Sequence, residues 1–198
     1  MGCTEHAAGQ LLPPLSAALA VLAPDHRFRF RIDRGPRLHE GLATGRIDLA
    51  LLLNAEDAGA LPIGDLAVTW YSAPTWSPPP RTEPVAVVAF DSPCALRNRA
   101  LETLAAHGIP AVIGAEATQL AGVQAAVGAG LGVALMATLG QTPPGLVESH
   151  DLPAAEPLQL FISSRNGLPE DVGQLAADAL RPLLRWTGQP NTSLDAAS

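Results

Sequence analysis

The most constraining feature of the sequence is a short helical pattern that leads directly into a continuous apolar run. Leu38 and Leu42 are spaced about one helical turn apart, and Gly45 ends the pattern. The run that follows, residues 47–53, contains one polar side chain, that of Asp48, and is too apolar to expose either face to water. Such a strand is typical of a parallel sheet that helices cover on both faces.

The same unit recurs in the second half of the chain. Residues 122–129 form a helical pattern, Gly130 interrupts it, and residues 131–136 resemble a second buried strand. Because the glycine-rich run 128–132 follows a helix and precedes a strand, it has the wrong order for a phosphate-binding loop and is expected to end the helix. Two such units predict two α/β lobes, with ligands bound between them.

The remaining periodicity supports an α/β fold in which the strands are largely parallel. Its predicted strands are residues 27–32, 66–71, 84–90, 110–114 and 157–163, and its predicted helices are residues 11–22, 95–107, 118–129 and 172–186. From Gln189 onward the sequence predicts a disordered tail.

Composition excludes several classes of function. A chain of 198 residues with 47% hydrophobic residues can bury a core, but its net charge of −7 argues against binding nucleic acid without another domain. Its two cysteines, Cys3 and Cys94, cannot form a disulfide framework or a zinc site, and no cofactor motif occurs. No apolar run spans a bilayer and no secretory signal is present, so we expect a cytoplasmic protein without membrane contact.

Residues 27–32 alternate basic and apolar side chains without exception. This period of two predicts a half-exposed strand with Phe28, Phe30 and Ile32 on one face. Arginines on the other face are typical of a sheet edge, where charge discourages unwanted pairing. Two interpretations remain open for this strand, a solvated sheet face and a dimer contact.

The sharpest local site is residues 91–94, where a predicted strand ends and a helix begins. Ser92 or Asp91 could simply cap the helix. Alternatively, Ser92, Cys94 and the nearby amides could hold a polar or anionic ligand, or Cys94 could act as a nucleophile or redox sensor. Three further segments have the same strand-to-helix position: residues 3–6, 35–37 and 116–119. In open α/β sheets, ligands bind at such strand ends.

Catalytic and metal-binding interpretations are weaker. The five histidines, His6, His26, His39, His107 and His150, lack ligand spacing, and each is expected to be a surface residue. Asp48 is expected to be a structural carboxylate that holds loop amides. We therefore predict no catalytic residues, no metal ligands and no cofactor.

Four segments together resemble the effector-binding domain of LysR-type transcriptional regulators. They are Leu-Leu-Pro-Pro-Leu at residues 11–15, the stretch at residues 38–51, Cys-Ala-Leu-Arg at residues 94–97 and the stretch at residues 124–133. The resemblance implies a fold similar to type 2 periplasmic binding proteins, with two lobes joined by two crossover strands near residues 66–72 and 161–165. Lobe one would take residues 1–66 plus 165–198, and lobe two residues 67–164.

The resemblance also implies a regulatory domain, not an enzyme, that binds a small-molecule effector in the cleft between the lobes. The alternative is a stand-alone binding protein or an enzyme on the same fold. Carried over to this sequence, the effector contacts would come from Thr4, Gly35, Pro36, Arg37, Ser92, Pro93, Cys94, Thr118 and Gln119. Arg37 would favour a carboxylate-bearing effector if its side chain turns inward.

Relatives dimerise side by side, which implies a homodimer built from helix 11–22, strand 27–32 and helix 95–107. The family's winged helix-turn-helix domain is absent from the sequence, so this chain alone is not expected to bind DNA. The effector domain normally opens with a central strand, and here the chain begins just after it. Either that strand is cut short, or the sheet is rearranged, or residues 1–4 supply a stub.

Overall fold

The buried strand expected at residues 47–53 is β3 (Leu49–Leu53), which lies at the centre of a five-stranded sheet in the order β2-β1-β3-β10-β4. The computed structural model describes residues 1–22, 24, 27–54 and 59–186. The other strands of this sheet are β1 (Gly2–Cys3), β2 (Arg31–Ile32), β4 (Leu61–Leu66) and β10 (Leu158–Ser164). The predicted tail from Gln189 lies outside the described residues.

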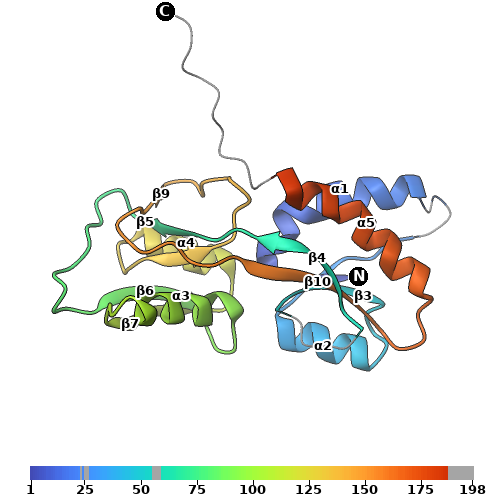
Figure 1. Ribbon diagram of the computed structural model, residues 1–198, viewed down its shortest axis with the longest axis horizontal. Helices are drawn as coiled ribbons and strands as arrows, with labels where there is room; N and C mark the ends of the chain where they lie inside the picture. Colours follow the sequence, from blue (N-terminus) through green and yellow to red (C-terminus); the bar gives the residue numbers. More distant parts are fainter. Residues whose placement is uncertain (23, 25–26, 55–58, 187–198) are drawn as a thin grey trace, which may run out of the picture.

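Helices cover both faces of this sheet, as the apolar run requires. Leu49 and Leu51 pack into a core with α1 (Glu5–Leu22) and α5 (Glu170–Trp186). Ala50 and Leu52 pack on the opposite face against α2 (Gly35–Ala43). Figure 1 shows α1 and α5 above the sheet and α2 below it. Each fully buried leucine contributes roughly 1.5–3 kcal/mol.

The second half of the chain forms two smaller sheets. Strands β6 (Val85–Phe90) and β7 (Ala111–Ala117) are parallel, whereas β5 (Thr69–Ser72) pairs antiparallel with β8 (Ala134–Met136) and β9 (Val147–Glu148). A parallel bridge between Val87 and Val133 connects the two sheets through hydrogen bonds. Helices α3 (Ala95–Ala106) and α4 (Leu120–Gly128) cover opposite faces of this assembly.

The two groups of elements lie side by side, and the chain crosses between them at β4–β5 and at β10 (Figure 1). We call the group around the five-stranded sheet lobe one and the other group lobe two. Because β10 pairs along its length with β3 and β4, residues 158–164 belong to the sheet of lobe one. The division at residues 66/67 and 164/165 stays a prediction, and this pairing favours moving its second boundary ahead of Leu158.

Several predicted elements differ from those observed. Helix α1 begins at Glu5, not at residue 11, because the Thr4 carbonyl accepts hydrogen bonds from the amides of Ala7 and Ala8. Pro13 and Pro14 therefore lie inside the helix. The strand expected at 66–71 is the end of β4 and the start of β5, while β9 and most of β4 were not anticipated. Both sheets of three or more strands contain antiparallel pairs, so the fold is less parallel than expected.

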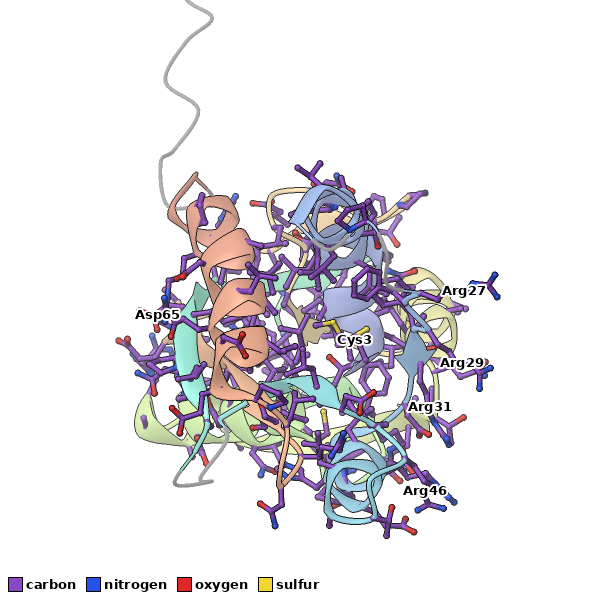
Figure 2. All side chains as sticks on the ribbon, turned by 90° about the vertical axis from the view of Figure 1, so that its right-hand side faces the viewer. Cys3, Arg27, Arg29, Arg31, Arg46 and Asp65 are labelled. Atoms are coloured by element: carbon purple, nitrogen blue, oxygen red, sulfur yellow. The ribbon has the colours of Figure 1, made fainter. Side chains whose placement is uncertain are left out.

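The edge strand expected over residues 27–32 pairs only at Arg31 and Ile32. The physical reason is that its neighbour β1 offers just two residues, which pair with Arg31 and Ile32 on one side and with β3 on the other. Residues 2–3 therefore supply the stub that was one of three alternatives for the first strand. Cys3 of this stub lies in the interior of the molecule (Figure 2), and burial raises the pKa of its thiol to about 11.

None of the helices formed by the described residues combines the length and the apolarity that a membrane span requires.

Candidate functional site

Four helix starts meet around one cavity of about 650 Å³. Each follows the carboxyl end of a strand: β1 leads to α1, β2 to α2, β6 to α3 and β7 to α4. The first two pairs belong to lobe one and the last two to lobe two, so the cavity is lined from both lobes. This convergence follows from the parallel pairing of β1 with β2 and of β6 with β7, which places each pair's carboxyl ends at one edge.

Seven of the nine predicted ligand-binding residues line this cavity: Thr4, Gly35, Pro36, Pro93, Cys94, Thr118 and Gln119. Arg37 and Ser92 are not among the described residues that line it. Since α2 begins at Gly35, Arg34 occupies the N-cap and faces the cavity, whereas Arg37 lies inside the first helical turn. The N-cap of α3 is Cys94, so the expectation that Ser92 or Asp91 caps this helix was wrong.

Asp91 instead joins the two lobes. Its carboxylate accepts a hydrogen bond from Arg34 at 2.7 Å, and its backbone carbonyl accepts a second one from the same guanidinium at 3.0 Å. Arg34 precedes α2 in lobe one, while Asp91 follows β6 in lobe two. The pair is 36% exposed on both side chains, so it is a partly solvated bridge between the lobes.

Glu5 forms a second connection between the lobes. One oxygen of its carboxylate accepts a hydrogen bond from the backbone amide of Leu120, the first residue of α4. Glu5 itself lies in the first turn of α1. A carboxylate is well suited to this position because the first amides of a helix are unpaired and carry partial positive charge.

His6 is the most deeply buried ionisable side chain of the site, with 8% exposure. Neither ring nitrogen makes a hydrogen bond of good geometry within the described part of the chain, although the ring approaches the backbone of Ala137, and it meets Phe90 edge-on at 5.1 Å. Burial lowers the pKa of His6 to about 4, although the backbone of Ala137 opposes this shift. The imidazole is therefore neutral near pH 7, and the expectation of a surface histidine was wrong at this position.

The other charged groups of the lining are engaged by the chain itself. Arg99 donates to the carbonyls of Glu156 and Pro157 and lies 3.9 Å from the carboxylate of Glu102. Burial alone would raise the pKa of Asp33, but the Arg34 amide and the Arg31 guanidinium hold it below its usual value. Among the described residues, no cluster of His, Cys, Asp or Glu could hold a metal ion.

Asp48 lies away from the cavity lining and has the structural role expected of it, with a different partner. Its carboxylate accepts a hydrogen bond from the guanidinium of Arg165 at 2.7 Å, and its carbonyl accepts one from the Arg165 amide. The carboxylate therefore holds the end of β10 and not loop amides.

Sequence reasoning missed Glu5, His6, Arg34 and Arg99 as site residues. The first three each lie within two positions of a predicted contact, and Glu5 and His6 belong to the segment 3–6 that the strand-to-helix order had indicated. Arg99 lies in the second turn of α3, and its place near β10 depends on how the lobes pack.

A family comparison decides what kind of domain this is. Residues 1–170 match the model of the LysR substrate binding domain. The chain belongs to the LysR substrate-binding domain family. It is 29% identical over 144 residues, 72% of its length, to the HTH-type transcriptional regulator PecT of Dickeya dadantii (strain 3937). The chain spans 45% of the length of that relative.

Solved structures of LysR-type regulatory domains share the fold. A cysteine-to-serine mutant of the OxyR2 regulatory domain from Vibrio vulnificus superposes with a TM-score of 0.76 at 17% identity, covering 92% of this chain and 94% of that one. A reduced form of OxyR from N. meningitidis superposes with a TM-score of 0.71 at 15% identity, covering 92% and 93%. The two-lobed fold similar to type 2 periplasmic binding proteins is thereby confirmed.

Membership in the LysR family also confirms that the chain is a regulatory, effector-binding domain and not an enzyme.

Proposed function

We propose that the cavity between the lobes binds the small-molecule effector of a LysR-type transcriptional regulator. The observation that carries this proposal is the convergence of four helix starts, two from each lobe, on one cavity of about 650 Å³. That volume is in the range of small-molecule sites. Seven predicted contact residues line it, including Thr118 and Gln119, which carry polar side chains.

The expected effector is a small carboxylate, recognised differently from the way the sequence suggested. Arg37 is not part of the lining, and Arg34 is already bound to Asp91. The helix starts of lobe two are more suitable, because neither Cys94 of α3 nor Gln119 of α4 makes a side-chain capping bond within the described structure, and both residues line the cavity. Unpaired amides at a helix start favour an anion.

Effector binding changes the arrangement of the two lobes because the effector binds one arrangement more tightly than another. An effector that contacts both lobes stabilises the arrangement in which those contacts form, and it shifts the population only by that difference. In a full-length regulator this shift would be transmitted to the DNA-binding domain. Such a protein works in the cytoplasm, and this chain alone would not bind DNA.

We also propose a homodimer in which the α1 and β2 region of one subunit faces α3 and β7 of the other. Two observations support it. Strands β2 and β7 both lie at sheet edges. The apolar side chains of Phe28 and Ile32 are 40% and 53% exposed, and Val112 on β7 is 48% exposed. An apolar strand edge of this kind is normally covered.

The effector site is tested by a thermal-shift screen of small carboxylates and aromatic acids, followed by two matched variants. Thr118 and Ser92 are both exposed residues of lobe two, and only Thr118 lines the cavity. Thr118→Trp fills the cavity and should abolish stabilisation by the compound found, whereas Ser92→Trp should preserve it. Stabilisation that survives Thr118→Trp would show that the compound binds elsewhere.

A further inference from the structure

Glu5 occupies the position where an anion would bind at the start of α4. Its carboxylate crosses from lobe one to accept the amide hydrogen of Leu120 in lobe two. Gln119, the N-cap of α4, makes no side-chain capping bond within the described structure, so a residue from the other lobe supplies this acceptor. The first amide of α4 therefore finds its hydrogen-bond acceptor in a charged group of the other lobe.

His6 is an independent sign that a ligand belongs here. It lies next to Glu5 on α1 and is 8% exposed, and beyond an approach to the backbone of Ala137 its ring nitrogens make no well-formed hydrogen bond in the described part of the chain. Burying polar atoms without partners is unfavourable, so such groups usually have a bound partner in some state of the protein. A molecule at the α4 start would supply one.

Glu5 and His6 also separate two cavities. Both residues line the effector cavity and a second cavity of about 190 Å³, whose lining includes Leu120 and Gln124. Movement of the Glu5 side chain would therefore join the effector cavity to the second cavity beside Leu120.

We propose that Glu5 is an internal competitor of the effector: its carboxylate holds the lobes together at the α4 start, and a carboxylate of the effector displaces it and binds there beside His6. This inference rests on the proposed function and adds the regulation of that site. One anion replaces another, so the helix start keeps its charge balance. What changes is the connection, because α4 is released from α1 and bound to the effector instead.

The competition can be tested with acetate as the probe, without knowing the natural effector. Glu5→Ala removes the internal carboxylate and leaves space for a small one at the α4 start. We expect acetate to raise the melting temperature of Glu5→Ala saturably, beyond the effect of sodium chloride at equal ionic strength. In the unmodified chain, half-saturation should require roughly tenfold more acetate, because Glu5 must first be displaced.

Glu83→Ala is the matched control, because it removes an exposed carboxylate that lines neither cavity in the described structure. It should respond to acetate as the unmodified chain does. If Glu5→Ala does not fold, Glu5→Gln replaces it: the neutral amide is held less firmly, so acetate should act at a lower concentration than in the unmodified chain. Equal acetate responses of the Glu5 variant and the unmodified chain would overturn the proposal.

A second readout separates competition from simple helix capping. In Glu5→Ala, acetate should shift the ring nitrogen signals of His6 in NMR spectra, and adding His6→Leu should weaken the acetate response several-fold. If Glu5 only caps α4, the variant would be less stable but His6 would not respond to acetate. Since this test uses no effector, its failure would leave the result of the Thr118→Trp comparison standing.

Discussion

Arg34 and Arg37 show how strongly a single residue's role depends on where a helix begins. The two arginines are three positions apart, yet only Arg34 lines the cavity, because α2 starts at Gly35. His6 makes the same point, since it lies on the buried side of α1 and is withdrawn from solvent despite its polar ring. The sequence alone did not assign a role to Arg34 or to His6. Their positions at the site became clear only once the start of each helix was known.

The buried His6 should make folding stability depend on pH. Its pKa is about 4 in the folded chain and about 6.5 when unfolded, so the unfolded state binds more protons between these values. Stability should be full above about pH 6.5 and fall as the pH drops toward 4, by roughly 3 kcal/mol at most. Urea unfolding across this range should show a shallower decline for His6→Leu.

The control for this prediction is His150→Asn, which changes an exposed histidine and should leave the pH dependence unchanged. Carboxylates such as Asp33, whose pKa is lowered by its hydrogen bonds, also lose stability on acidification, but they remain in every variant. Identical slopes for His6→Leu and the unmodified chain would show that His6 does not titrate in this way.

At the scale of elements, lobe two depends on a close approach between β6 and the segment before β8. Gly130 and Gly132, both predicted to form a turn after α4, have φ angles of +79° and +151°. The Cβ atom of a side chain at Gly132 would lie 2.8 Å from the carbonyl carbon of Ala86 and would overlap this carbonyl group. A Cβ atom at Gly130 would meet nothing within 4 Å. The turn was predictable, but this contact was not.

These two glycines form a matched pair for a stability test. Gly130→Ala introduces only the backbone strain of a left-handed residue and should cost about 1 kcal/mol. Gly132→Ala should cost at least about 2 kcal/mol more, because it also forces β6 away from Val133 and breaks the hydrogen bonds that join the two sheets. Urea unfolding measures the loss in the free energy of unfolding for both variants. Equal losses would mean that β6 can move away from Val133 without a further loss of stability.

At the scale of the whole molecule, the outer edge of lobe one remains incompletely paired. Figure 2 shows Arg27, Arg29 and Arg31 projecting outward on one side of the molecule. The alternation predicted a strand with one buried face, but Phe28 and Ile32 are exposed in the single chain. A second subunit covering this edge explains why apolar side chains alternate with the arginines.

Light scattering tests the dimer with two variants of equal exposure. Phe28 and Val147 are both 40% exposed, but only Phe28 lies in the proposed interface. Phe28→Asp places an unpaired charge in that interface and should shift the mass from dimer to monomer, with an increase of roughly tenfold or more in the dissociation constant. Val147→Asp should not. A monomeric unmodified chain would refute the dimer, and a dimeric Phe28→Asp variant would place the interface elsewhere.

The sequence by itself determined the fold class and the family, because both depend on local patterns. The apolar run 47–53 required a strand buried on both faces, and the repeated helix-to-strand order required two lobes. The strand-to-helix order at four other places identified four helix starts as the ligand edge, which is why seven of nine predicted residues line the cavity. Strand lengths such as that of β2 were not predictable, because pairing depends on the length of the neighbour.

Only the tertiary structure decided which charges meet across the cavity. Arg34 and Asp91 are 57 positions apart, and Glu5 and Leu120 are 115 apart. No periodicity encodes such pairs, because they depend on how two lobes, each folded around its own sheet, are oriented. The separation of the two cavities by Glu5 and His6 depends on the same orientation, so the internal competitor could be inferred only once both lobes were in place.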